Sequence, residues 1–322
     1  MATFLVLGVR LAFDKAQIGQ KVAWIGVSFT VRPWEILLEI PVEKLKDLEQ
    51  LIEEMMSSNV VSLKTLRSFS GKCTNIATLV YMWRPFLSNL WAAMADRDNE
   101  HLSNAPPNCV WLKQIQTSLW WIRAFIAGQQ GSISRTFAFN SLYGDKAPFT
   151  ITTDASVWGL GGWISYNNVP LAFFAADITD DDERILNCKR GDPNFQQLFE
   201  GLALLVAVRL WSPLWRSRRV WLTLRSDNIG ALSIFSAVRG RSTSLNLLAR
   251  EYALDMSAGT FEPDFIEHIP GISNAVADKL SRKNDPQYKK SWSVPSFLAK
   301  AKEIIPPPRF DTWWRTRVVS QT

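Results

Sequence analysis

The segment from residue 149 to residue 163 reads FTITTDASVWGLGGW, and it carries the strand pattern from which the predicted sheet is built. Residues 149–154 alternate with the two-residue period of a β-strand, and a second strand-like run follows near 159–165. After this pair we expect a strand near 169–174, a helix near 194–211 and a strand near 219–226. Helices near 228–237 and 242–257, a strand near 262–268 and a helix near 274–282 should follow. This order predicts an α/β architecture, a mixed sheet with helices on its faces.

Four acidic residues fall at the ends of these strands or on helices that would face them. They are Asp154 at the end of FTITTD, Glu200 within FQQLFEGLALLVAVRLW, Asp227 at the end of VWLTLRSD, and Asp278 within NAVADKLSR. Singly, an Asp at a strand end more often caps a turn or a helix, and a lone Glu on a helix more often faces solvent. Together they predict a two-metal site, because two divalent ions about 3.5–4 Å apart can align a water and stabilise a leaving oxygen. Mg²⁺ suits such a site because it prefers oxygen ligands.

At these residues the chain resembles a known family. The blocks TDASVWGLGGWI, QLFEGLALLVAV, LRSDNIGAL and HIPGISNAVADKLSR resemble, in order, the four signature blocks of the ribonuclease H domain in retroelement reverse transcriptases. The resemblance covers roughly residues 148–284. It implies hydrolysis of the RNA strand of an RNA–DNA hybrid, with two Mg²⁺ or Mn²⁺ ions held by Asp154, Glu200, Asp227 and Asp278. It also implies that Asn274 supports the substrate or the loop geometry near the fourth ligand.

The loop before the last acid departs from the pattern of many cellular ribonucleases H, which carry a mobile His there. Here only GIS separates Pro270 from Asn274, and His268 ends the preceding strand. A structural role for His268 at the strand edge and a role in proton transfer are both open. The departure bears on the rate of the reaction more than on its mechanism.

Several basic and aromatic residues near these blocks are candidates for holding a hybrid, whose recognition depends on backbone shape and 2′-hydroxyls. The candidates are Arg225, Arg239, Arg241, Lys279 and Arg282, and each taken alone is more often a solvated surface charge. Trp158 lines a groove or packs in the core. The polar stretch 176–194, ADITDDDERILNCKRGDPN, reads as a loop whose acids are solvated.

The N-terminal half carries a second resemblance, over about residues 5–95. The segment LGVRLAFDKAQIGQKVAWIGVSFTV resembles the end of a reverse transcriptase palm, and SLKTLRSFSGKCTNIATLVYMWRPFLSNLWAAM resembles a thumb and connection block. Between them, IPVEKLKDLEQLIEEMM has apolar residues at helical spacing. A plain amphipathic helical bundle is the alternative.

The sequence contains no Tyr-x-Asp-Asp motif, so this chain alone is not expected to synthesise DNA. The fingers and most of the palm would lie upstream of Met1, as in a piece of a larger polyprotein. We expect a palm-end remnant over 1–40, a helical thumb and connection over 41–128, a linker over 129–147, the ribonuclease H-like domain over 148–284 and an irregular tail over 285–322.

Composition fits a globular chain with a polyanionic partner. The 322 residues carry a net charge of +6, and the hydrophobic share is 47%. Three widely spaced cysteines show no metal-finger spacing and fit a reducing compartment, so we expect an intracellular protein, cytoplasmic or nuclear. We find no apolar run approaching the ~20 residues of a membrane span and expect no membrane partner.

Two other functions stay open. One is a non-catalytic module that binds hybrids or assembles with the remaining reverse transcriptase domains. The other is a different nuclease or a recombinase of the same fold superfamily, which the order Asp, Glu, Asp, Asp with HIPGISN disfavours.

Overall fold

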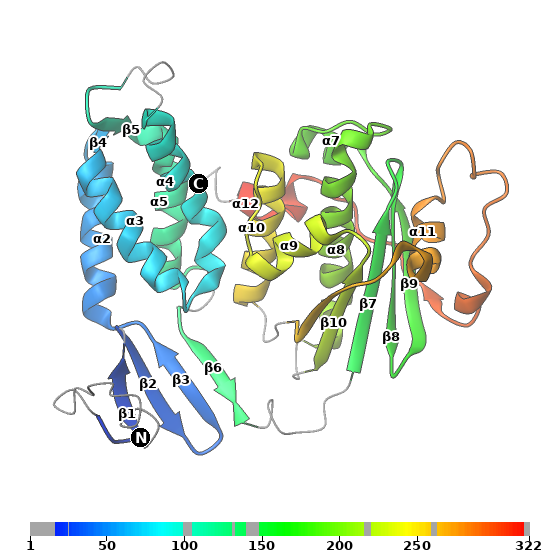
Figure 1. Cartoon of the computed structure of the whole chain (residues 1–322), viewed down its shortest axis with the longest axis horizontal. Coiled ribbons are helices and arrows are strands. Elements are labelled where there is room, and N and C mark those ends of the chain that lie inside the picture. Colours follow the sequence, from blue (N-terminus) through cyan, green and yellow to red (C-terminus); the bar gives the residue numbers. More distant parts are fainter. Residues whose placement is uncertain are drawn as a thin grey trace, which may run out of the picture.

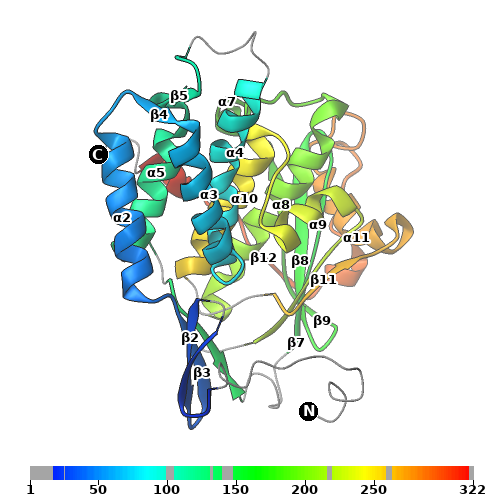
Figure 2. The same ribbon diagram turned by 60° about the vertical axis from the view of Figure 1, so that its left-hand side comes forward.

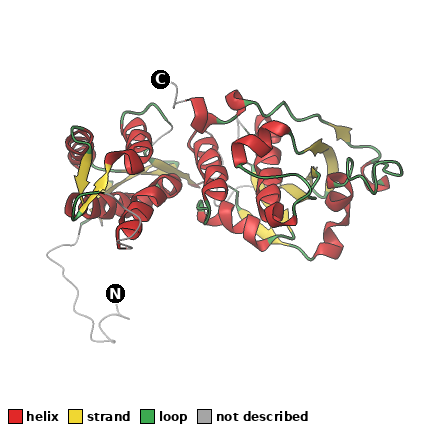
Figure 3. Ribbon diagram, turned by 90° about the horizontal axis from the view of Figure 1, so that it is seen from above, coloured by secondary structure: helices red, strands yellow, loops and turns green. Residues whose placement is uncertain are grey.

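The structure is a computed structural model of the chain. It describes residues 17–24, 26–98, 105–130, 133–139, 148–215, 220–258 and 263–318. Two parts lie side by side along the longest axis, an N-terminal part of helices on a small sheet and a C-terminal part built on a larger sheet (Figures 1 and 3). Residues 1–16 lie outside the described residues, and with them the beginning of the segment that resembles a palm.

The N-terminal sheet contains four antiparallel strands in the order β1-β2-β3-β6. Their bounds are β1 Lys21–Trp24, β2 Val27–Arg32, β3 Glu35–Glu39 and β6 Arg135–Ala138. The strand β6 lies inside the stretch that we expected to be only a linker. Its four residues, RTFA, are too few to show a period, and the partner that makes them a strand is β3, about a hundred residues earlier.

Helices pack against one another above this sheet (Figure 2), so the predicted mainly helical segment is confirmed. They are α2 Val42–Met56, α3 Leu63–Ala77, η2 Tyr81–Trp83, α4 Arg84–Asp98 and α5 Leu112–Ile126, joined by the short antiparallel pair β4 Val60–Ser62 and β5 Cys109–Trp111. The apolar stripe of α2 faces inward, with Leu48, Ile52 and Met55 buried. This spacing of four and three residues is what defines one face of a helix.

The larger sheet has the strand order β11-β10-β7-β8-β9-β12. Its strands are β7 Pro148–Ala155, β8 Gly159–Tyr166, β9 Val169–Asp177, β10 Trp221–Ser226, β11 Phe265–His268 and β12 Lys302–Glu303. The strands β7, β8 and β9 form an antiparallel meander, whereas β10 runs parallel to both β7 and β11. The predicted mixed sheet with flanking helices is therefore confirmed.

Helices cover both faces of this sheet. On one side lie α8 Gln196–Trp211, α9 Ile229–Ala237 and α10 Thr243–Ala258, and on the other lies α11 Ala275–Ser281 (Figure 1). Glycines in β8 allow α11 to approach. A Cβ on Gly161 would lie 2.4 Å from the Ser281 nitrogen and 2.7 Å from the Ala277 oxygen, so the backbone of α11 lies directly on the strand. The glycines that mark the second strand in the sequence therefore seat the helix that carries Asp278.

The polar stretch 176–194 is not a loop of solvated acids, and this prediction was wrong. It contains the helix α7 Asp180–Leu186, and Asp182 is fully buried. Thr179 and Asp182 cap each other at the start of the helix, and Arg309 from the tail binds Asp182 through two hydrogen bonds of 2.8 and 2.6 Å. The sequence conceals this because the cation that neutralises Asp182 lies 127 residues away.

The tail has little regular structure, as expected, yet it packs onto the sheet and helices. It contains η6 Ser296–Leu298, β12, η7 Asp311–Trp313 and α12 Arg315–Val318, and it runs from α11 back to α10 (Figure 1). Leu298, Arg309 and Trp314 are buried, and β12 pairs in parallel with β9. The described tail is therefore part of the domain that precedes it.

One helical stretch, Pro193–Leu214, is long and apolar enough to cross a membrane by those two criteria alone, whereas we expected no apolar run of that length. It contains α8, and 67% of its most apolar window is buried inside the protein. A helix that is apolar on every side is also what the centre of a large core requires, which is where α8 lies.

The two parts of the chain touch through α4 and α10. Asn246 Nδ2 donates to the Pro85 oxygen at 2.8 Å and to Ser88 Oγ at 2.7 Å, and Arg250 Nε donates to the same Pro85 oxygen at 3.2 Å. These contacts come from the buried Asn246 and the half-buried Arg250, and they link the C-terminal part to the helical part.

Candidate metal centre

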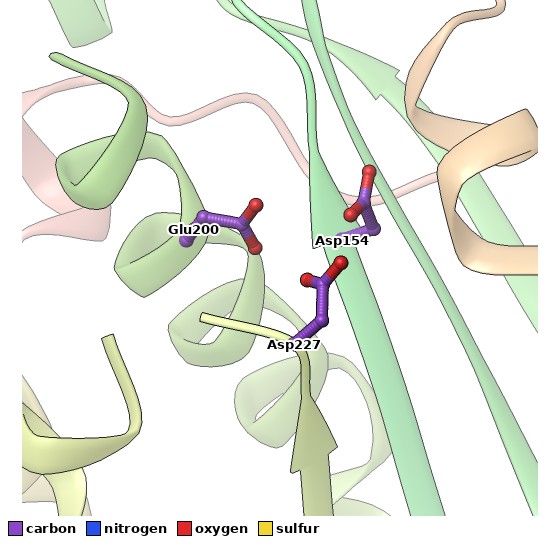
Figure 4. Close-up of side chains that lie close together, drawn as sticks. All are labelled: Asp154, Glu200 and Asp227. Carbon is purple, nitrogen blue, oxygen red and sulfur yellow. The ribbon is translucent and has the colours of Figure 1, made fainter. Parts of the chain in front are cut away.

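Three carboxylates from three elements meet at one end of the larger sheet. Asp154 lies at the end of β7, Glu200 in the second turn of α8, and Asp227 immediately after β10. One oxygen atom from each lies within 4.8 Å of the others, and Figure 4 shows the three groups pointing toward one another. Asp154 and Glu200 are buried, whereas Asp227 is half-buried and opens the site to solvent.

Each buried carboxylate is held in place by a neighbouring side chain. Ser281 Oγ donates to Asp154 Oδ2 at 2.7 Å, and Asn274 Nδ2 lies 3.3 Å from both Asp154 Oδ1 and Asp227 Oδ1. Gln196 Nε2 donates to Glu200 Oε1 at 3.1 Å and also contacts the backbone oxygen of Ala155. The carboxylates are therefore oriented before any ion binds.

The Asn274 amide also donates to the Thr153 oxygen at 3.1 Å, and its support of the substrate or of the loop geometry stays a prediction. Ser281 and Gln196 were not singled out from the sequence. Gln196 was detectable in principle, because it precedes Glu200 by four residues and so shares its helix face. Ser281 gives no comparable signal, because its partner Asp154 lies 127 residues earlier.

Burial and mutual repulsion hold protons on this site in the absence of metal. Burial and the charges of Asp154 and Asp227 raise the pKa of Glu200 to about 9, against the opposing effect of the Gln196 hydrogen bond. Burial also raises the pKa of Asp154 to about 7. There the Ser281 hydrogen bond and the charge of Arg282 act in the opposite direction. Carboxyl groups that repel one another in this way are the expected state of a cation site without its cation.

The residues present fit a divalent metal. The second oxygen of Glu200, Oε2, is buried and has no hydrogen-bond partner, which is costly for a carboxylate unless another ligand satisfies it. All the donor atoms that converge are oxygens, the type that Mg²⁺ and Mn²⁺ prefer.

Asp278 lies outside this group of three. It is in the first turn of α11, and its carboxylate is bound by Arg282, with 2.7 Å between Arg282 Nη2 and Asp278 Oδ1. Asp278 is still close enough for its charge to raise the pKa of Asp154. The predicted set of four carboxylates is therefore brought together as three, with the fourth at the margin in an ion pair.

The other candidate residues take several positions. His268 is exposed at the end of β11, and its Nε2 lies 3.1 Å from the backbone oxygen of Asp227, so it contacts the chain that carries a carboxylate. Arg225 pairs across the strands with Glu267 at 2.8 Å. Arg239 and Arg241 are exposed between α9 and α10. Trp158 is half-buried, and its ring lies against Gly191.

Lys279 and Arg282 line a cavity beside the site, together with residues of the tail. The charge of Arg282 also lowers the pKa of Asp154.

Comparison with known proteins gives matches in structure. No family model matches the chain, and no curated protein matches it in sequence. An RNase H1 isolated from compost by a metagenomic approach is 18% identical over 46% of this chain and 99% of its own length, with a TM-score of 0.34. A foamy viral protease–reverse transcriptase in complex with double-stranded DNA is 14% identical in two structures.

These two viral structures cover 79% and 66% of this chain, with TM-scores of 0.28 and 0.27, and the chain spans only 38% of the length of either. TM-scores this low carry no argument about activity. The fold itself is the mixed sheet with flanking helices predicted from the sequence.

Proposed function

We propose that this chain hydrolyses the RNA strand of RNA–DNA hybrids in a reaction that depends on Mg²⁺ or Mn²⁺. The observation that carries the proposal is the convergence of Asp154, Glu200 and Asp227, whose ligand atoms lie within 4.8 Å of one another. The order of these acids along the chain, with Asp278 after them, matches the retroelement ribonuclease H blocks in the sequence. A net charge of +6 favours a polyanionic substrate.

Four carboxylates would hold the metal ions, and three polar side chains would orient those carboxylates. Asp154, Glu200 and Asp227 would hold a first ion, and Asp278 would complete a second position on leaving Arg282. When bound, such ions align a water and stabilise the leaving 3′ oxygen, which gives 3′-hydroxyl and 5′-phosphate products. Ser281, Asn274 and Gln196 fix the carboxylates, and burial strengthens their attraction for a cation.

The proposal also includes the partners of the chain and its location in the cell. The blocks that resemble a palm end and a thumb suggest that further reverse transcriptase domains are partners, in an intracellular location, cytoplasmic or nuclear. The three cysteines are free, which suits a reducing compartment.

The test uses the full chain with an end-labelled RNA–DNA hybrid, with Mg²⁺ and with a chelator. We expect RNA cleavage only with the metal, and none of double-stranded DNA. Asp227→Asn removes a ligand charge at a half-buried position, and cleavage should fall roughly a hundredfold or more, as for the loss of one preorganised group that stabilises charge in the transition state. Asp47→Asn is the matched control, because Asp47 is an exposed carboxylate paired with Lys72 on the helical part. Equal cleavage by the wild type and Asp227→Asn would overturn the assignment.

One observation favours a second function. Asp278 is paired with Arg282, so three of the four expected carboxylates converge. An incomplete ligand set favours a module that binds hybrids without cutting them. Hybrid binding in chelator, with no cleavage at any Mg²⁺ or Mn²⁺ concentration, would establish this function in place of the first.

A further inference from the structure

A cavity of about 480 Å³ opens beside the metal centre, between α11 and the first turns of the tail. Asp278, Lys279 and Arg282 line it from the helix, and Tyr288, Ser291 and Trp292 line it from the tail. Its size is that of pockets that take small organic groups, which range over about 300–1,000 Å³. The expected domain boundary at residue 284 would have removed half of its wall.

The tail wall is fixed by its own hydrogen bonds. Asp285 is buried, and its Oδ1 accepts from the Gln287 backbone at 2.9 Å while its carbonyl accepts from Tyr288 and Lys289 at 3.0 and 2.8 Å. Trp292 Nε1 donates to the Lys279 oxygen at 2.6 Å, which ties the tail to the helix. The cavity is therefore built before a ligand arrives.

The lining combines cations with aromatic rings. The Arg282 guanidinium lies 5.4 Å from the centre of the Tyr288 ring, and Lys283 Nζ lies 5.3 Å from that of Trp292. Tyr288 keeps 44% of its surface exposed. Lys289 and Lys290 are exposed on the same turn. Positive charge beside an exposed aromatic ring is the combination that holds single-stranded nucleic acid, whose phosphates meet cations while its bases stack.

The cavity is one helical turn from the carboxylates. Asp278 lines the cavity, and Ser281, on the same helix, donates to Asp154. Arg282 also lines the cavity, and its charge lowers the pKa of Asp154. A strand whose scissile phosphate lies at the metal centre would therefore continue past this opening.

We propose that this cavity binds an unpaired nucleotide of a strand that extends beyond the hybrid, with its phosphate at Lys279 and Arg282 and its base against Tyr288. Bases inside the hybrid are already stacked on their neighbours, so an open ring selects an unpaired one. The inference deepens the proposed function and depends on it for the direction in which the strand runs. It assigns to the tail a binding role in addition to its packing.

The test measures binding by fluorescence anisotropy, with the full chain in chelator so that no cleavage occurs. The probes are a blunt RNA–DNA hybrid and the same hybrid with a short single-stranded extension at each end in turn. We expect the wild type to bind one of the extended hybrids about five- to tenfold more tightly than the blunt one, the lower part of the range for one base on one ring. Tyr288→Ala should lose this gain, and Tyr288→Phe should keep it.

Two matched controls separate the cavity from general effects. Phe310→Ala removes another exposed aromatic residue of the tail and should keep the gain. Lys279→Gln removes one charge but keeps a donor for Ser293, and it should lower the slope of log affinity against log salt by about 0.7, the value for one phosphate contact on a single strand. Lys300→Gln, an exposed lysine outside the cavity, should leave that slope unchanged.

Equal affinity of the wild type for all probes would overturn the proposal, as would a loss in Tyr288→Ala that is the same for blunt and extended hybrids. The proposed function is judged separately, by cleavage with Mg²⁺. If the chain binds an extended hybrid more tightly through Tyr288 but cuts no hybrid, the proposed cleavage is refuted and the nucleotide-binding cavity is supported. If the chain cuts hybrids but binds blunt and extended hybrids equally, the cleavage is supported and the cavity proposal is refuted.

Discussion

Asp278 and Arg282 form an ion pair along α11, with 2.7 Å between Asp278 Oδ1 and Arg282 Nη2 and with about two fifths of each side chain exposed. The carboxylate expected to be the fourth metal ligand thus binds a guanidinium one helical turn away. Arg282 at the same time lowers the pKa of Asp154 through its charge. Arg282 therefore acts in two ways: it neutralises the charge of Asp278, and it favours the ionised form of Asp154.

Replacing Arg282 by Gln should tighten metal binding. The change removes one positive charge beside the carboxylates and frees Asp278, so at pH 8 or above we expect Mn²⁺ to bind roughly three- to tenfold more tightly, as for one unit charge near a protein surface. Calorimetric titration of the metal-free full chain measures this. Arg184→Gln is the control, because Arg184 forms a similar exposed pair with Asp181. An unchanged Mn²⁺ affinity in Arg282→Gln would show that the pair does not restrain the site.

Metal binding should strengthen as pH rises and should release protons. The pKa of Asp154 is raised to about 7 and that of Glu200 to about 9, so both carboxyl groups retain protons at neutral pH that an ion must displace. We expect Mg²⁺ affinity to increase from pH 6 to pH 9. Titrations in buffers of different ionisation enthalpy count the protons. An affinity that is flat over this range would contradict the raised pKa values.

The metal-free protein should lose stability over the same range. The unfolded chain gives up these protons near the ordinary carboxyl pKa of about 4, whereas the folded chain holds them until about pH 7 and pH 9. Their contribution to the free energy of unfolding is therefore fully present below about pH 4 and is lost as the pH rises through the two folded-state pKa values. Glu200→Gln replaces a carboxyl group that must take up a proton on folding at pH 8 by a neutral amide, so at this pH its melting temperature should exceed that of the wild type by several degrees. Saturating Mg²⁺ should reverse the order, because only the wild type keeps the full ligand set. A wild type that is the more stable in chelator would contradict this prediction.

Gly161 and Gly71 give a matched pair of glycine substitutions. A Cβ at Gly161 would meet the backbone of α11 at 2.4 Å, whereas a Cβ at Gly71, inside α3, meets nothing within 4 Å. Gly161→Ala should destabilise the protein by about 1–3 kcal/mol, as overpacking does, and should reduce cleavage because α11 carries Ser281. Gly71→Ala should be neutral or stabilise by up to about 1 kcal/mol. Denaturant unfolding measures both, and equal effects would show that α11 is not seated as described.

The Arg309–Asp182 pair anchors the tail. Both side chains are almost fully buried, at 3% and 0% exposure, and Arg309 also donates to the Asp177 oxygen at 2.6 Å. Arg309→Met leaves Asp182 buried without its cation, which should cost about 3–5 kcal/mol. The double variant Asp182→Asn with Arg309→Met should recover part of this loss, because Asn can keep the cap to Thr179. A loss in the double variant equal to the sum of the two single losses would rule out the coupling.

Primer extension should be absent at every Mg²⁺ concentration. The sequence has no paired aspartates of the Tyr-x-Asp-Asp type, and within the described residues the one converging group of carboxylates is that of Asp154, Glu200 and Asp227. A primed template with all four nucleotides tests this, with hybrid cleavage by the same preparation as the positive control. Any templated extension would show that a second metal site exists.

The sequence by itself determined the order of strands and helices in the C-terminal part. Alternation over FTITTD and VWLTLRS, and the long apolar run around Glu200, are local properties of the chain, and the observed β7, β10 and α8 agree with the predicted ranges to within two residues. The acids at the ends of these elements were visible for the same reason. A strand end or a helix face is defined by its near neighbours, so short-range pattern is enough to find it.

The tertiary structure alone decided what depends on partners far away in sequence. The sequence predicted a solvated Asp182, whereas the folded chain pairs it with Arg309. The residues RTFA form a strand because they pair with β3. The tail, too, was recognised as part of the fold only through its burial. Asp278 was expected among the carboxylates, and only the positions of Asp154, Glu200 and Asp227 in space showed that it lies at the margin of their group. Charge pairing and burial depend on distances in space, and a sequence pattern records distance only along the chain.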